Sequence, residues 1–181
     1  MFLTTYVVLF WPRCRGFVFS VMFFRLCLIV LFLGCSTACE SPEQQRERLT
    51  RATALAYFET YQQRENWDSL LSFYRDDIQF EDVNLNYQTK GIEAFKEFYN
   101  WPDTSFRKIV DNQKHLVLQT MMVQDSIVVG RGKLNPFFWN NELQEWPDDF
   151  TIWLYFDENM KIYKQIDWVR YPAWMIQSFE F

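Results

Sequence analysis

Residues 66–82 read NWDSLLSFYRDDIQFED, and this stretch decides the fold class. Asn66 is a favoured helix N-cap residue and Asp68 follows in the first turn, so a short helix is predicted over residues 67–74. Residues 78–83 then alternate between apolar and polar side chains, which is typical of a half-buried strand. The stretch therefore predicts a helix that leads directly into a sheet.

Further helices are predicted on both sides of this stretch. An apolar stripe at helical spacing runs over residues 49–64. Residues 40–48 are polar and are interpreted as a short tether that passes into this helix, with Ser41 before Pro42 as a helix-entry signal. Residues 91–99 predict a third helix, after a loop over residues 84–90.

The chain after Phe106 is predicted to be mostly strand. Alternating patterns and turn residues indicate strands over 116–123, 126–134, 150–156 and 161–171, and a short terminal helix over 173–179. Three helices followed by a run of strands indicate an α+β domain over residues 49–181. We expect about three N-terminal helices packed on one face of a curved antiparallel sheet.

The N-terminal 34 residues differ from the rest because they are almost all apolar. The run over residues 26–33 is shorter than the roughly 20 residues that a membrane-spanning helix needs, and Arg25 precedes it. This pattern is typical of a signal peptide, so residues 1–39 are expected to be a leader. Met22 is an alternative start, and a membrane anchor formed by residues 2–34 is the alternative structure.

All four cysteines lie within the first 39 residues. A disulfide scaffold in the domain is therefore excluded. Gly34-Cys35 and Ala38-Cys39 both resemble the bacterial lipobox, in which the cysteine accepts diacylglycerol and becomes the new N-terminus. We expect lipid on Cys39, with Cys35 as the alternative, and hence a protein anchored in the bacterial cell envelope, facing the periplasm or the cell surface. An ordinary secretory leader is the other interpretation.

Charge and composition exclude several classes of partner. After residue 39, 15 basic residues face 23 acidic ones, a net charge of about −8, and no basic stripe is present. Nucleic acid is therefore not an expected partner. A single histidine and a cysteine-free domain argue against a zinc site, and no glycine-rich phosphate loop is present, so neither metal nor cofactor is expected.

Two more stretches carry the same family pattern as residues 66–82. Residues 89–95 are similar to a helix start of the form G-x-x-A-I, and residues 155–162 are similar to a hairpin before a last strand. Over about residues 45–172 the chain resembles the nuclear transport factor 2-like superfamily, in its SnoaL-like form. The resemblance implies a cone-shaped sheet. It does not fix function, because this cone hosts isomerases, cyclases, dehydratases, hydrolases and proteins without catalysis.

The resemblance implies two candidate catalytic acids. Asp82 matches the proton-shuttling base of ketosteroid isomerases, and an apolar cone would raise the pKa of its carboxyl. However, Phe58, beside Tyr57, matches the isomerase tyrosine, and Ile152 matches its second acid, so the oxyanion hole is incomplete. Asp167 lies on the last strand, where limonene epoxide hydrolases also place an acid.

An aromatic-walled cavity is the remaining site prediction, since aromatic residues make up 20% of the chain. The expected ligand-binding residues are Tyr57, Phe58, Phe80, Ile152, Leu154, Gln165, Val169 and Trp139. Residues 137–139 are interpreted as a loop at the mouth of the cone, and His115 as a structural residue. We expect a protein that binds a small, largely apolar or aromatic molecule without a complete catalytic set. The alternatives are an acid–base enzyme that uses Asp82 and a non-catalytic module that forms a homodimer through the sheet.

Overall fold

The computed structural model describes residues 40–146 and 149–179. The predicted leader, the alternative start at Met22 and the predicted lipid attachment at Cys39 or Cys35 lie outside the described residues. Within the described ranges, no helix has both the length and the apolar content that a membrane crossing requires.

The first described helix, α2 (Pro42–Gln63), begins at a capping box. The Ser41 hydroxyl accepts the Gln44 N–H at 3.1 Å, and the Gln44 side chain accepts the Ser41 N–H at 3.0 Å. The segment predicted as a tether is therefore helical from Pro42 onward, because its entry signal lies at its beginning. The helix ends at Arg64, whose backbone is left-handed with φ 47°.

Three short helices lie where the sequence predicts them. In α3 (Trp67–Leu71), the Asn66 side chain accepts the Ser69 N–H at 2.9 Å, as the capping residue predicts. This helix ends before Tyr74 because Tyr74 already belongs to the next strand. Helix α4 (Ile92–Tyr99) buries Phe95 completely, and the terminal helix α5 (Ala173–Phe179) lies where a helix was predicted.

The main sheet has six strands in the order β2-β1-β9-β8-β5-β4. Their bounds are β1 (Tyr74–Asp82), β2 (Tyr87–Lys90), β4 (Leu116–Gln124), β5 (Ile127–Leu134), β8 (Phe150–Phe156) and β9 (Ile162–Val169). The expectation of a purely antiparallel sheet is corrected at one pairing, because β1 and β9 run parallel. No hairpin joins these two strands, so nothing local forces them to be antiparallel. Strand β2 also replaces part of a predicted loop.

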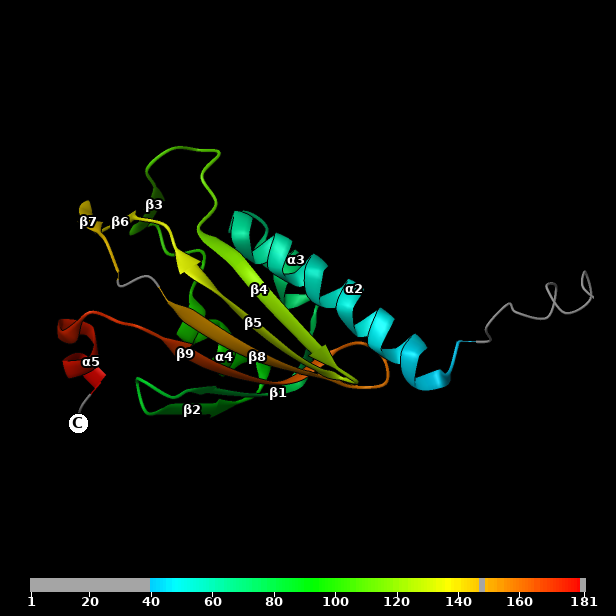
Figure 1. Ribbon diagram of the computed structural model, residues 1–181. Coiled ribbons are helices and arrows are strands. Elements are labelled where there is room, and N and C mark those ends of the chain that lie inside the picture. The colour runs from blue at the N-terminus through cyan, green and yellow to red at the C-terminus, as the bar shows by residue number, and fades with distance from the viewer. Residues whose placement is uncertain (1–39, 147–148, 180–181) are drawn as a thin grey trace, which may run out of the picture. The chain divides into compact units, whose positions relative to one another are not determined.

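A second, three-stranded sheet lies at one end of the first, with the order β3-β6-β7. It is formed by β3 (Phe106–Lys108), β6 (Phe137–Trp139) and β7 (Glu142–Gln144). The apolar segment predicted as a loop is thus a strand, because Phe137 to Trp139 pair with β3 on one side and β7 on the other. Figure 1 shows this small sheet and α5 at the same end of the main sheet.

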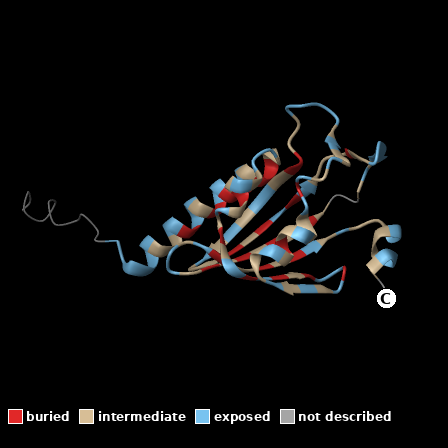
Figure 2. Cartoon of the chain, turned by 180° about the vertical axis from the view of Figure 1, so that it is seen from behind, coloured by how far each residue is buried: buried red, intermediate tan, exposed pale blue. Residues whose placement is uncertain are grey.

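Helix α2 packs on β4 and β5, and α4 packs on β1 and β2. Figure 2 shows buried residues concentrated where these helices face the sheet. The contact between α2 and β5 requires glycine, since a Cβ at Gly130 would lie 2.2 Å from Phe58 Cζ. This close packing fills the space between α2 and β5 with the Phe58 side chain.

Candidate functional site

A cavity of about 250 Å³ lies between the main sheet, the small sheet and α5. Its wall is mostly aromatic, with Phe98, Phe106, Phe137, Trp139, Trp146 and Phe150 among the lining residues. Trp174 and Met175 of α5 contribute to the same wall. The small sheet and α5 therefore form part of the wall of the cavity.

Asp167 is the carboxyl group that lines this cavity, and it is only 2% exposed. The Tyr99 hydroxyl donates to Oδ2 at 2.5 Å, and Gln165 Nε2 donates to Oδ1 at 2.9 Å. Burial, together with the nearby charge of Asp82, raises the pKa of Asp167 to about 7, although the hydrogen bonds from Tyr99 and Gln165 act to lower it. The group can therefore hold or release a proton near neutral pH.

A buried network fixes the orientation of this carboxyl group. The Tyr74 hydroxyl donates to Gln165 Oε1 at 2.6 Å, and the Tyr57 hydroxyl donates to the same atom at 3.3 Å. The amide NH₂ of Gln165 is thereby directed toward Tyr99, at 2.7 Å, and toward Asp167. Burial raises the pKa of each of these tyrosines well above 10, so they remain hydrogen-bond donors at neutral pH.

Asp82 joins two parts of the chain through its two carboxylate oxygens. Oδ2 accepts the Tyr171 hydroxyl at 2.5 Å, and Oδ1 accepts the Leu85 N–H at 3.0 Å. Burial raises the pKa of Asp82, and the hydrogen bonds from Tyr171 and the backbone lower it. Among the described residues Asp82 does not line the cavity, whereas Tyr171, which it holds, does.

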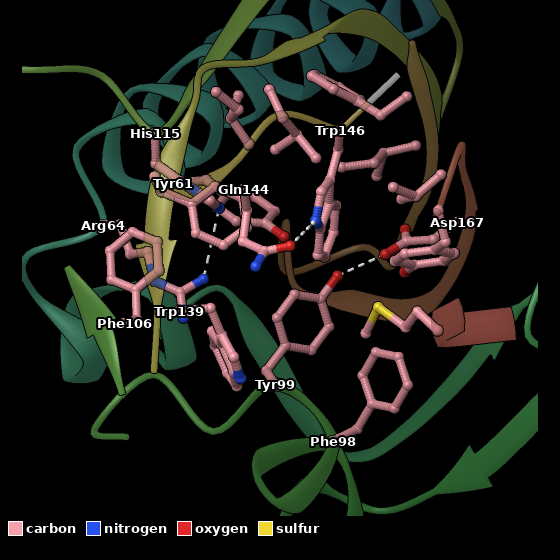
Figure 3. Close-up of a pocket in the computed structure, with 18 of the residues that line it drawn as sticks. Tyr61, Arg64, Phe98, Tyr99, Phe106, His115, Trp139, Gln144, Trp146 and Asp167 are labelled. Atoms are coloured by element: carbon pink, nitrogen blue, oxygen red, sulfur yellow. Dashed lines mark hydrogen bonds between the residues drawn. The ribbon is translucent and has the colours of Figure 1, made fainter. Parts of the chain in front are cut away.

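Arg64 and His115 lie on the side of the cavity away from Asp167, as Figure 3 shows. The Arg64 guanidinium lies 3.9 Å from the centre of the Phe106 ring, and its Nη1 is 3.5 Å from His115 Nε2. Burial lowers the pKa of Arg64 to about 10. Burial, with the charges of Arg64 and Lys108, holds the pKa of His115 well below 6.5. At pH 7 the pair is therefore a cation beside a neutral imidazole.

The structure divides the sequence-predicted site residues into two groups. Four line the cavity: Asp167, Ile152, Val169 and Trp139. Six lie buried in the core beside it or beneath it: Tyr57, Phe58, Phe80, Leu154, Gln165 and Asp82. Within the second group, Phe58 packs against Gly130 of β5, Phe80 packs against the rings of α4, and Gln165 and Asp82 bond to the cavity-lining Tyr99 and Tyr171.

Sequence reasoning missed several lining residues, among them Tyr61, Arg64, Tyr99 and Tyr171. Tyr61 could have been found, because it continues the buried stripe of α2 four residues after Tyr57. Arg64 gave no such signal, since its side chain reaches the cavity from the left-handed residue that ends α2. Among the described residues, no group of three potential ligands could hold a metal ion.

No protein-family model matches the sequence, and no curated protein matches it. Solved structures do match it. A protein from Shewanella putrefaciens assigned as a SnoaL-like polyketide cyclase has a TM-score of 0.53 and 16% identity, covering 71% of this chain and 93% of that one. TerC, co-crystallised with polyporic acid, has a TM-score of 0.52 and 16% identity, covering 72% and 97%.

A third match is an NTF2-like protein of unknown function from Burkholderia pseudomallei, with a TM-score of 0.52 and 14% identity, covering 74% of this chain and 98% of that one. Identities this low show a shared fold and carry no information on activity. The chemistry must therefore be argued from the cavity itself.

Proposed function

The chain has the nuclear transport factor 2-like fold of the SnoaL-like proteins, and we propose that it binds a small, flat, largely apolar molecule in its cone. One observation carries this proposal: the cavity has mostly aromatic walls and a buried carboxyl group, Asp167, which accepts a hydrogen bond from the Tyr99 hydroxyl. Aromatic walls favour a flat apolar ligand, and a few fixed polar groups orient it. TerC, a protein with a similar fold, was co-crystallised with polyporic acid, which supports a small-molecule ligand.

The polar end of the ligand meets Asp167. Because the pKa of its carboxyl is about 7, both protonation states are populated at neutral pH. The carboxylate accepts a hydrogen bond from a ligand hydroxyl, and the carboxylic acid donates one to a ligand carbonyl. The site thus suits an aromatic or alicyclic molecule with a hydroxyl or carbonyl group at one end.

Binding of 2-naphthol, a neutral fluorescent phenol, tests this function. Val169 lines the cavity, so Val169→Trp should fill part of it and weaken binding at least tenfold while the protein stays folded. The matched control is Val110→Trp, at a residue that is 61% exposed and outside the lining, and it should bind as the unchanged protein does. Equal affinity in all three proteins would show that 2-naphthol does not use this cavity.

Acid–base catalysis is a second candidate function, favoured by the raised pKa of Asp167 within an apolar cavity. We assign this role to Asp167 rather than Asp82 because Asp167 lines the cavity, whereas Asp82 does not. In this role the Asp167 carboxylate takes a proton from the carbon next to a ligand carbonyl and returns one to it.

Exchange of the α-protons of 2-tetralone in D₂O measures such a step directly by NMR. We expect exchange above the buffer rate with the unchanged protein, and the buffer rate with Asp167→Asn. Asp111→Asn, at an exposed residue, is the control and should retain full exchange. If Asp167→Asn exchanges as fast as the control, Asp167 is not the base.

We also propose that residues 1–39 direct the protein to the bacterial cell envelope and that Cys39, or alternatively Cys35, carries lipid. The lipobox-like pattern at the end of an apolar run supports this proposal. Mass spectrometry of the membrane-extracted protein should show an N-terminal cysteine with diacylglycerol on its sulfur. An unmodified N-terminus would contradict it, and Cys39→Ser or Cys35→Ser identifies the modified residue.

A further inference from the structure

We propose that Arg64 and His115 form a carboxylate-binding subsite, so that the ligand of the cavity is an aromatic carboxylic acid bound as its anion. This inference rests on the proposed function, since it names the class of the ligand that the cavity binds. Two observations carry it: the buried Arg64 cation lines the cavity without an ion pair among the described residues, and the His115 imidazole beside it has a ring nitrogen without a hydrogen-bond partner.

The backbone holds Arg64 in place. As the residue that ends α2, it adopts a left-handed conformation, and its N–H donates to the carbonyl oxygens of Thr60 and Tyr61 at 3.2 and 3.1 Å. Its guanidinium lies over Phe106, at 3.9 Å, and is 5.4 Å from the ring of Trp101. The Phe106 ring covers the guanidinium, and both residues belong to the cavity wall, as Figure 3 shows.

Arg64 forms no direct ion pair in the described part of the chain, and Asp103 acts on its charge only from beyond ion-pair distance. Other cations form such pairs: Arg75 pairs with Asp77 at 2.7 Å, and Lys108 with Glu65 at 3.0 Å. No described carboxylate lies within 4.0 Å of the Arg64 guanidinium, and its buried Nε has no hydrogen-bond partner. A charge held in this way costs folding free energy, and a bound anion would compensate it.

His115 adds a second polar group at the same place. It is 6% exposed, and its Nδ1 is buried without a hydrogen-bond partner among the described residues. The main chain holds it on both sides, since its N–H donates to Gln62 O at 2.6 Å and its carbonyl accepts the Asn135 N–H at 2.9 Å. The imidazole is thus a fixed group of the cavity wall beside the guanidinium.

A carboxylate is the anion that fits this arrangement. The planar guanidinium presents paired N–H donors that match the two oxygens of a carboxylate, and one cation balances one negative charge. Asp167 on the far side of the cavity repels an anion, so it fixes the orientation. The carboxylate binds at Arg64, and the hydroxyl or carbonyl group of the ligand points to Asp167.

The test compares acids with amides of the same shape: benzoate with benzamide, cinnamate with cinnamamide, and 2-naphthoate with 2-naphthamide. We expect the acid of at least one pair to bind at least tenfold more tightly than its amide. Arg64→Met should remove that preference, and Arg64→Lys should reduce it. Arg107→Met is the matched control, because Arg107 also stacks on a phenyl ring, Phe138 at 4.1 Å, but does not line the cavity.

A second readout uses the fact that His115 is the only histidine in the chain. In ¹⁵N-histidine-labelled, tag-free protein, its ring signals should shift when the preferred acid is added and stay unchanged with Arg64→Met. Equal binding of acids and amides, with no effect of Arg64→Met, would overturn the subsite while the proposed binding function stands. Absence of binding by every acid, every amide and 2-naphthol would overturn the binding function itself.

Discussion

Two buried carboxyl groups, Asp82 and Asp167, pair in register on the neighbouring parallel strands β1 and β9. Their surroundings give them separate roles. Asp82 accepts a tyrosine hydroxyl and a backbone N–H, so it joins the end of β1 to the segment after β9. Asp167 faces the cavity, where a ligand can reach it. At the residue scale, the site is therefore defined by one carboxyl group.

The raised pKa of Asp167 predicts a pH dependence of stability. The folded protein keeps the proton until about pH 7, whereas the unfolded chain releases it near 3.8. The contribution of Asp167 to the free energy of unfolding is thus fully present below about pH 4 and is lost as pH rises through about 7. Over this window the loss amounts to at most about 4 kcal/mol.

Urea unfolding at pH 4.5, 6 and 7.5 measures this effect as a difference between the unchanged protein and Asp167→Asn. As pH rises, we expect the free energy of unfolding of Asp167→Asn to increase relative to that of the unchanged protein, because asparagine does not titrate. His115, with its lowered pKa, acts in the opposite direction but is present in both proteins. If the difference in free energy of unfolding is the same at all three pH values, Asp167 titrates normally in the folded state.

At the scale of elements, the glycines of strand β5 allow helix α2 and strand β4 to pack closely against it. A Cβ at Gly132 would lie 2.0 Å from the carbonyl oxygen of Val117 on β4, and 2.8 Å from Phe150. The obstacle is backbone, which cannot rotate away as a side chain can. Strand β4 is also irregular at this point, between Leu118 and Thr120, so the sheet bends where the glycine lies.

We therefore expect Gly132→Ala to lower the free energy of unfolding by about 3 kcal/mol, at the upper end of the cost of overpacking. Gly130→Ala should cost less, because its nearest obstacle is the Phe58 ring, a side chain. Thr120→Ala, at an exposed residue of β4, should change stability by less than about 0.5 kcal/mol. Chemical denaturation ranks the three variants, and a tolerated Gly132→Ala would refute this account of the bend.

The elements that were predictable from sequence are those with a strong local pattern. The hairpin of β8 and β9 followed from strict alternation, and that alternation also placed Asp167 and Val169 on the inner face. The parallel pairing of β1 with β9 was not predictable, because the two strands are brought together by the fold and by no turn between them. The small sheet was missed for the same reason.

At the scale of the whole molecule, the site could be predicted only in part. Its location inside a cone and its aromatic character followed from the resemblance and the composition. The positive side of the cavity did not, because Arg64 and His115 come from segments distant in sequence. A periodic pattern reports which face of an element is buried, but not which end of the domain stays open.

The predicted homodimer would form through the outer face of the main sheet. Trp168 on β9 is 37% exposed, and its ring lies 6.0 Å from that of Trp153 on β8. Association of two copies through this face stays a prediction. Light scattering over a range of concentrations measures the mass in solution and decides between a monomer and a dimer.

A crystal structure of the protein grown with 2-naphthol tests the central claim most directly. We predict the naphthalene ring within the aromatic walls, close to Tyr99 and Trp146, with its hydroxyl oxygen within hydrogen-bond distance of the Asp167 carboxyl group. A cavity closed by its own phenylalanine and tryptophan side chains, with 2-naphthol absent from it or bound elsewhere, would contradict the account.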